Sequence, residues 1–298
     1  MEVVMKEIFY SKVMLFGEYS VIRESMALAI PYNVYEGYLS FNTESYEIDN
    51  ELMALYQYLK NRGNLLLDFD IEKFFTDINC GLFFNSTIPK GFGIGSSGAL
   101  CAALVARYSK VRQEDIKSLK KFFSEIESHF HGASSGLDPL ISFLNSPILI
   151  KEGQINQVTL PELAKGQGGI FLLNTGRDRR TEPLVNLFLE KCKSDDFSAL
   201  CSSVLNPITN SCINSYLKED IRSLYEFFRE LSDFQYRHFN QMIPKNFQPL
   251  WKEGLKSEEF YLKLCGAGGG GFLMGITRNF ENTRQKLKYF GVQPVITF

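Results

Sequence analysis

Hydrophobic and polar residues follow two kinds of pattern along this chain. Short strand-like apolar runs occur at residues 3–9, 12–16, 27–30, 37–41, 80–84, 147–151, 169–174, 261–264, 272–276 and 292–298. Helical segments, indicated by apolar spacing or by Ala and Leu content, occur at residues 51–60, 99–107, 115–130, 139–144, 182–193, 208–216, 221–239, 248–254 and 280–290. Because strands and helices alternate in both halves, the pattern predicts an α/β or α+β sandwich and not a helical bundle.

The length of the chain limits the number of domains that it can form. A chain of 298 residues is long enough for one large domain or two domains of medium size with a substantial core. Hydrophobic residues make up 45% of the sequence and include 26 Phe, which is typical of a globular protein. The segment 154–168 separates two strand-like runs, so we predict domains at residues 1–163 and 164–298.

Charge, cysteine content and the absence of long apolar runs argue against a nucleic-acid-binding, secreted or membrane protein. The 32 Lys and Arg against 34 Asp and Glu give a net charge of −2 without a basic block, so no nucleic-acid partner is expected. The six cysteines contain no Cys-x-x-Cys pair, which indicates a reducing compartment. The first residues lack the features of a signal peptide and no run of 18 apolar residues occurs. We therefore expect a soluble, cytoplasmic protein without a membrane partner.

Two glycine-rich segments, at residues 89–98 and 266–271, stand out from the rest of the sequence. The first precedes a helical segment and the second joins two strand-like runs, and backbone N–H groups in such loops can bind phosphate. The spacing Gly93-x-Gly95-x-x-Gly98 also satisfies a dinucleotide-binding pattern, but the loop follows Pro89 instead of the first strand of a sheet. A serine-capped structural turn is the other interpretation. Together the two loops favour nucleotide chemistry.

Five motifs connect these loops to a known family. They lie at residues 11–19, 89–97, 127–138, 174–185 and 263–272, and they read SKVMLFGEY, PKGFGIGSS, ESHFHGASSGLD, NTGRDRRTEPLV and KLCGAGGGGF. In this order they resemble the GHMP small-molecule kinases over nearly the whole chain, and they are most similar to the mevalonate kinase branch. The resemblance implies an N-terminal α/β nucleotide-binding domain and a C-terminal ferredoxin-like α/β sandwich.

The resemblance also assigns roles to residues. It implies that Asp138 and Lys12 are catalytic, which suits phosphoryl transfer because a primary alcohol is a weak nucleophile that a carboxylate can orient and deprotonate. It implies that Ser97 and Glu127 hold Mg²⁺, a hard cation that prefers oxygen ligands. By the same resemblance ATP is bound by Lys90, Gly91, Gly93, Gly95, Ser96, Ser97 and Gly98, and the acceptor by Glu18, Tyr19, Thr181, Gly268 and Gly269.

The expected function is ATP- and Mg²⁺-dependent phosphorylation of the primary hydroxyl of mevalonate in isoprenoid biosynthesis, and a homodimer is compatible with the sequence. Another GHMP kinase, acting on phosphomevalonate, a sugar or a polar alcohol, is the nearest alternative, and three arginines (Arg177, Arg179 and Arg180) favour an anionic acceptor. A non-catalytic metabolite sensor of the same fold and an oxidoreductase are alternatives from other classes.

Several positions depart from the family pattern. Tyr10-Ser11-Lys12 stands where Pro-Gly-Lys is usual, and Tyr19 replaces a common histidine. Gly98 replaces an alanine, a small change that the tight loop is expected to accept. His129 and His131 are interpreted as structural, because no metal-ligand spacing surrounds them.

Overall fold

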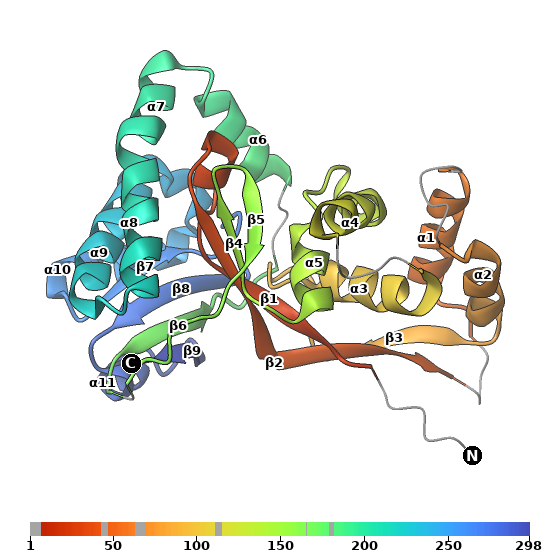
Figure 1. Ribbon diagram of the computed structural model, residues 1–298. Helices are drawn as coiled ribbons and strands as arrows, with labels where there is room; N and C mark the ends of the chain where they lie inside the picture. Colours follow the sequence, from red (N-terminus) through yellow and green to blue (C-terminus); the bar gives the residue numbers. More distant parts are fainter. Residues whose placement is uncertain (1–6, 43–46, 63–68, 111–114, 165, 179–181) are drawn as a thin grey trace. The chain divides into compact units, whose positions relative to one another are not determined.

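The computed structural model describes residues 7–42, 47–62, 69–110, 115–164, 166–178 and 182–298. Its strands are β1 (Phe9–Phe16), β2 (Ala27–Phe41), β3 (Leu82–Ser86), β4 (Ile148–Lys151), β5 (Gln154–Gln157), β6 (Gly169–Asn174), β7 (Phe260–Leu264), β8 (Phe272–Thr277) and β9 (Val292–Thr297). Its α-helices are α1 (Asn50–Lys60), α2 (Ile71–Asn79), α3 (Ser96–Tyr108), α4 (Ile116–His131), α5 (Leu137–Leu144), α6 (Glu182–Lys191), α7 (Asp195–Leu200), α8 (Asn206–Leu217), α9 (Ile221–His238), α10 (Gln248–Ser257) and α11 (Phe280–Lys286). Shorter turns are the 3₁₀ segments η1 (Ser20–Arg23), η4 (Asn240–Met242) and η5 (Lys245–Phe247) and the π segment η3 (Cys201–Leu205). The predicted α+β architecture is confirmed (Figure 1).

The chain divides into two compact units. The first unit holds the described residues up to Lys12 together with Pro31–Lys90 and Ile94–Ser146. The second holds Val13–Ile30, Gly91–Gly93 and Pro147–Phe298. Strands β1 and β2 therefore contribute residues to both units. The predicted boundary between residues 163 and 164 places both strands in the first domain, and that boundary stays a prediction.

The first unit consists of helices packed beside a strand pair. Strand β2 pairs antiparallel with β3, with Gly37 opposite Ser86. Helices α3, α4 and α5 pack on one another, and Figure 1 shows them on the same side of the β2–β3 pair. The side chains of Asp49, Asp70 and Asp115 accept hydrogen bonds from the first backbone N–H groups of α1, α2 and α4, which explains where these helices begin.

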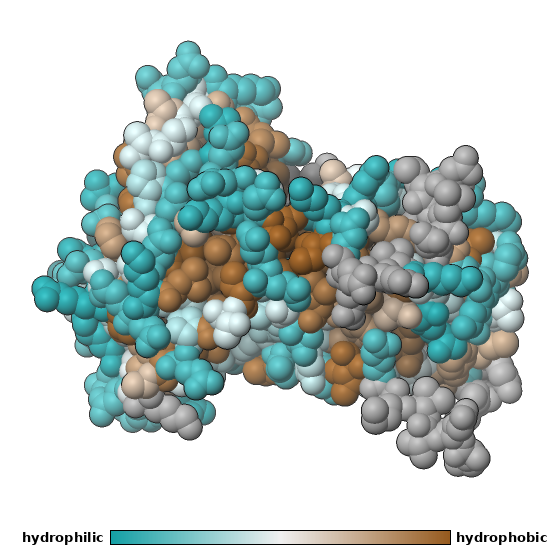
Figure 2. Space-filling model, in the orientation of Figure 1, coloured by the Kyte–Doolittle hydropathy of each residue, from teal (hydrophilic) through white to brown (hydrophobic). Residues whose placement is uncertain are grey.

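The second unit is built on a four-stranded antiparallel sheet in the order β7-β8-β6-β9. Every residue of β7 and β8 is buried, including Lys263 within the otherwise apolar β7. Helices α9 and α10 contact β7, and α8 packs on α9. The visible face of α10 is mostly hydrophilic in Figure 2, as expected for an amphipathic helix that covers a sheet. No helix in the described part of the chain has the length and apolarity needed to span a bilayer.

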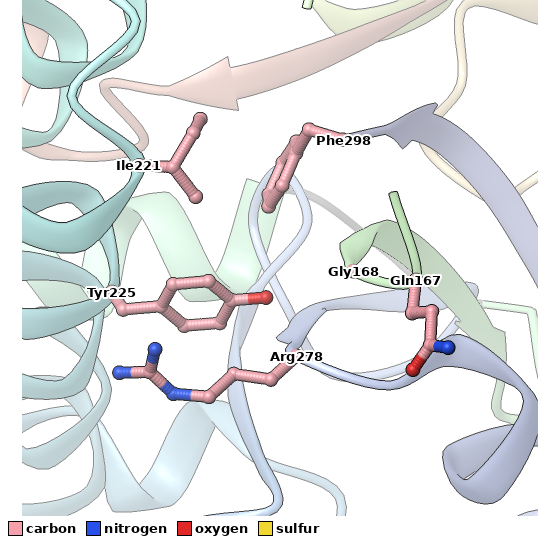
Figure 3. A pocket seen from close by; sticks show the side chains of 6 residues that line it. All are labelled: Gln167, Gly168, Ile221, Tyr225, Arg278 and Phe298. Atoms are coloured by element: carbon pink, nitrogen blue, oxygen red, sulfur yellow. The ribbon is translucent and has the colours of Figure 1, made fainter. Parts of the chain in front are cut away.

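The second unit also contains a shallow hollow of about 240 Å³ (Figure 3). In it the Arg278 guanidinium lies over the Tyr225 ring, 4.3 Å from the ring centroid. The hydroxyl of Tyr225 donates a hydrogen bond to the carbonyl of Thr277. No residue that lines this hollow belongs to the predicted site; the lining consists of Gln167, Gly168, Ile221, Tyr225, Arg278 and Phe298.

Several elements differ from the sequence-based prediction. Residues 3–6 of the strand predicted at 3–9 lie outside the described residues, and β1 covers Phe9–Phe16. The runs at 27–30 and 37–41 form one continuous strand, β2, and α11 ends at Lys286 and not at residue 290. The elements that the pattern did not predict are α2, β5 and α7.

Candidate active site

An ion pair between Lys12 and Asp138 forms the centre of the site in the first unit. The Lys12 Nζ lies 2.9 Å from the Asp138 Oδ1, and the two side chains are 6% and 32% exposed. Lys12 comes from β1, and Asp138 is the second residue of α5. The neighbouring Ser11 is buried, and its hydroxyl donates to the carbonyl of Tyr32 at 2.7 Å. The unusual serine of the first motif therefore connects two strands.

Two glycines allow the backbone to come close to this ion pair. A Cβ on Gly95 would lie 2.9 Å from the Cγ of Lys12, and Gly95 has a φ of 83° that favours glycine. A Cβ on Gly98 would lie 2.9 Å from the carbonyl carbon of Asp138 and 2.9 Å from the nitrogen of Pro139. The first glycine loop thus packs directly against both members of the pair. Helix α3 starts at Ser96, three residues before the predicted start.

The predicted metal ligands lie together. The Ser97 hydroxyl donates to the Glu127 Oε1 at 3.3 Å, and the Nε2 of His131 lies 2.9 Å from the same hydroxyl oxygen. The hydroxyl of Ser134 donates to the Glu127 Oε2. Glu127 is only 3% exposed and shares the buried stripe of α4, so it does not lie on a solvated helix face.

The charge of Glu127 is poorly stabilised by the protein alone. The pKa of Glu127 is raised to about 8, mainly by burial and also by the charge of Asp138. Hydrogen bonds from Ser134 and Ser97 and the charge of Lys12 only partly oppose this shift. A divalent cation would favour the ionised carboxylate, so the oxygen donors Ser97 and Glu127 fit Mg²⁺. Within the described ranges no group of three or more His, Cys, Asp or Glu side chains could hold a metal ion.

The other predicted ATP-binding residues have varied surroundings. Lys90 is exposed, and its Nζ lies 2.6 Å from the Glu51 Oε2. Ser96 begins α3, where the first backbone N–H groups of a helix have no partner within the helix. Gly91 and Gly93 belong to the second unit. These assignments stay predictions.

In the second unit, Glu18 forms a buried ion pair with Lys263. The distance from the Lys263 Nζ to the Glu18 Oε1 is 2.5 Å, and both side chains are almost completely buried. Burial raises the pKa of Glu18, and the nearby Lys263 partly opposes this shift. The hydroxyl of Tyr19 donates to the carbonyl of Ala267 at 2.5 Å. Both residues were predicted to bind the acceptor, and their polar groups contact the second glycine loop and the strand before it.

The second glycine loop itself is closely packed. The N–H of Gly269 donates to the carbonyl of Met242 at 2.6 Å, and a Cβ on Gly268 would lie 2.6 Å from the same oxygen. A Cβ on Gly271 would lie 2.5 Å from the carbonyl oxygen of Phe92, so this glycine lets the two loops touch. Thr181, predicted to bind the acceptor, lies outside the described residues.

The structure thus brings Lys12, Asp138, Ser97 and Glu127 into one cluster. Sequence reasoning missed two of their neighbours. His131 had been interpreted as structural, although its position four residues after Glu127 places both on one face of α4. Ser134 had no signal of its own, because only the folded turn after α4 carries it back to Glu127.

Comparison with known proteins shows which class of proteins the chain resembles. Residues 52–146 match the family model of the GHMP kinases N terminal domain. The chain resembles mevalonate kinase from Mus musculus, with 28% identity over 215 residues that cover 64% of this chain and 53% of the mouse protein. It resembles mevalonate kinase from Pyrococcus abyssi, with 24% identity over 324 residues that cover 96% of this chain and 93% of that protein. The matched segment thus spans about half of the mouse relative and most of the archaeal one.

Solved structures agree on the fold. The L. major mevalonate kinase in complex with R-mevalonate has a TM-score of 0.67 at 18% identity, and the match covers 96% of this chain and 91% of that one. The Streptococcus pneumoniae phosphomevalonate kinase in complex with phosphomevalonate and AMPPNP has a TM-score of 0.68 at 14% identity, with 99% of both chains covered. The GHMP kinase fold and the resemblance to this class of proteins are confirmed. Among named proteins, the chain is similar to the mevalonate kinases.

Proposed function

We propose that the chain is an ATP- and Mg²⁺-dependent kinase that phosphorylates the primary hydroxyl of mevalonate in isoprenoid biosynthesis. The observation that carries the proposal is the Lys12–Asp138 ion pair of 2.9 Å beside Ser97 and Glu127. The names of the sequence relatives support mevalonate as the acceptor.

In the proposed reaction the acceptor oxygen attacks the γ-phosphorus of ATP, and the bond from that phosphorus to the bridging oxygen breaks. Asp138 orients the hydroxyl and takes its proton. The ammonium of Lys12 orients the Asp138 carboxylate through their 2.9 Å ion pair, and it stabilises negative charge on the transferring oxygens. Bound Mg²⁺, held by Ser97 and Glu127, would neutralise charge on the phosphates.

Two features explain why the pair can act in this way. Lys12 is fixed along its length, because its stem lies against Gly95 and its backbone N–H donates to the carbonyl of Ile94 at 2.9 Å. Asp138 is partly exposed, so an alcohol can approach its free oxygen. A rigid lysine beside an accessible carboxylate is suited to positioning a small acceptor.

A coupled assay of ADP release tests the proposal with purified protein, ATP, Mg²⁺ and mevalonate. Turnover is expected for the wild type, and Asp138→Asn is expected to lose it because an amide cannot accept the proton. Asp233→Asn is the matched control, since it makes the same change at an exposed carboxylate whose 2.9 Å ion pair with Arg237 belongs to no predicted site. Undiminished turnover by Asp138→Asn would rule out this catalytic assignment.

A phosphorylated acceptor is the second candidate. It is favoured by the phosphomevalonate kinase structure, which matches the fold as closely as the mevalonate kinase structure does. A panel containing mevalonate, phosphomevalonate, galactose and homoserine separates these acceptors by their kcat/KM values. A protein that binds ATP and phosphorylates none of them would support the non-catalytic sensor.

A further inference from the structure

The end of the second glycine loop is fixed by hydrogen bonds from its backbone to neighbouring segments. The N–H of Gly271 donates to the carbonyl of Arg177 at 2.6 Å, and the carbonyl of Gly271 accepts from the N–H and the hydroxyl of Thr175 at 2.9 and 2.7 Å. The N–H of Gly269 is bound to Met242, as described above. These bonds fix residues 269–271 to neighbouring segments of the second unit.

The start of the loop is held by two consecutive residues that lie about 250 positions away in sequence. The Oε1 of Glu18 accepts from the Lys263 ammonium at 2.5 Å and from the N–H of Gly266 at 3.4 Å. The next residue, Tyr19, donates its hydroxyl proton to the carbonyl of Ala267 at 2.5 Å. Strand β7 and the first two residues of the loop are therefore connected to one dipeptide.

The ammonium of Lys263 is bonded to groups in the protein interior and not directed to a ligand. Its ammonium donates to the Glu18 Oε1 and to the carbonyl of Leu264 at 2.8 Å, and it lies 3.8 Å from the sulfur of Met274. An ammonium has three protons to donate, so these contacts account for its bonding capacity. Its side chain is 0% exposed, which is tolerated only because the charge is paired.

The backbone at Tyr19 supports the same role. Its φ of 64° and ψ of −47° are uncommon for a residue with a side chain, and such strain persists only where surrounding contacts impose it. The Tyr19 ring lies 4.9 Å from the Phe188 ring and 5.4 Å from the Phe239 ring, between centroids. The aromatic packing directs the hydroxyl toward the loop.

We propose that Glu18 and Tyr19 are positioning residues that set the conformation of the second glycine loop before any ligand binds. A glycine-rich segment loses much conformational entropy when it becomes ordered. If the loop is already ordered, binding of a phosphate ligand does not have to offset that entropic cost. The conformation of the second loop also affects Phe92 of the first glycine loop, because the backbones of Gly271 and Phe92 are in contact. The inference rests on the proposed function, in which the first glycine loop binds ATP and Gly268 and Gly269 of the second loop bind the acceptor.

Hydrogen–deuterium exchange of residues 266–271 tests the proposal without turnover. Tyr19→Phe and Glu18→Gln are expected to speed exchange of the loop amides by about fivefold or more, and to weaken binding of AMPPNP with Mg²⁺ by a similar factor. The matched control is Tyr225→Phe, which also removes a buried hydroxyl that donates to a backbone carbonyl in the second unit. In that variant, exchange in the loop and AMPPNP binding are expected to stay within about twofold of the wild type.

The proposal is overturned if Tyr19→Phe exchanges its loop amides no faster than Tyr225→Phe, or if faster exchange leaves AMPPNP binding unchanged. If Glu18→Gln fails to fold, Tyr19→Phe alone decides. Turnover by the wild type tests the proposed function separately. Faster exchange and weaker AMPPNP binding in Tyr19→Phe, in a protein that phosphorylates none of the acceptors, would support the positioning role and reject the kinase.

Discussion

Replacing Gly98 by alanine places a methyl group where helices α3 and α5 meet. The added Cβ would lie 2.9 Å from the carbonyl carbon of Asp138 and from the nitrogen of Pro139, and 3.0 Å from the Cβ of Asp138. Non-bonded carbon atoms are comfortable at about 3.5 Å or more, so the neighbours must move by roughly half an ångström. The nearest atoms belong to the backbone and cannot rotate away. The start of α5, with Asp138, must therefore shift.

Two energies of opposite sign decide the stability of Gly98→Ala. Alanine is favoured over glycine within a helix by about 1 kcal/mol. Overpacking of a closely packed site costs about 1–3 kcal/mol. We expect the packing cost to exceed the helix gain, with a net loss of about 1 kcal/mol and a Tm lower by about 2–4 °C. Since misplacement by about 1 Å can reduce a rate about 100-fold, a shift of half that size is expected to lower kcat about tenfold.

Thermal unfolding and the ADP-release assay measure these two effects in the same preparations. Gly153→Ala is the control: it also places alanine at a glycine, here with a φ of 70° and open space around the new Cβ, so it is expected to lower Tm without lowering kcat. A Gly98→Ala protein with the wild-type Tm and a kcat within about twofold of wild type would refute the reasoning.

Two other predictions concern Glu127 and Lys12. The pKa of Glu127 is raised from 4.5 to about 8, so the folded protein binds this proton more tightly than the unfolded chain does. The resulting stabilisation is complete below the unfolded pKa and is lost as the pH rises through about 8. Without Mg²⁺, the Tm of the wild type should therefore fall between pH 6 and pH 9. An equal fall in Tm for Glu127→Gln would show that Glu127 is not its origin. Lys12→Met removes the partner of Asp138 and should lower kcat/KM by about 100-fold or more, measured by ADP release, and a loss below about threefold would exclude a catalytic ammonium.

The parts of the fold that the sequence predicted well are those with strong apolar periodicity. Strand β5 was missed because its residues, Gln154–Gln157, are mostly polar and exposed, and the tight turn at Glu152 and Gly153 pairs it with β4. Helix α7 buries none of its residues, so it offered no amphipathic stripe. The runs at 27–30 and 37–41 were predicted as separate strands, yet Pro31 belongs to β2 and lies between the segment paired with β4 and the segment paired with β3.

The site was predictable where a motif fixed both the residue type and its place next to a helix. Ser97, Glu127, Lys12 and Asp138 form one cluster because helices α3, α4 and α5 pack together. The partner of Glu18 was not predictable, because nothing near Lys263 in sequence indicates that its ammonium points into the protein interior. Long-range pairs of this kind depend on how strands are placed side by side, which local patterns do not specify.

The departure at Ser11 shows how a change inside a motif can leave the chemistry untouched. Its hydroxyl is buried and donates to the carbonyl of Tyr32, and successive side chains of a strand point to opposite faces, so it does not share the side of Lys12. Ser11→Gly, which restores the residue usual in this motif, is therefore expected to cost about 1–2 kcal/mol through the lost hydrogen bond and the flexible glycine. The ratio of kcat/KM between mevalonate and phosphomevalonate should remain unchanged. A changed ratio at an unchanged Tm would show that Ser11 acts on the acceptor and not on the strands.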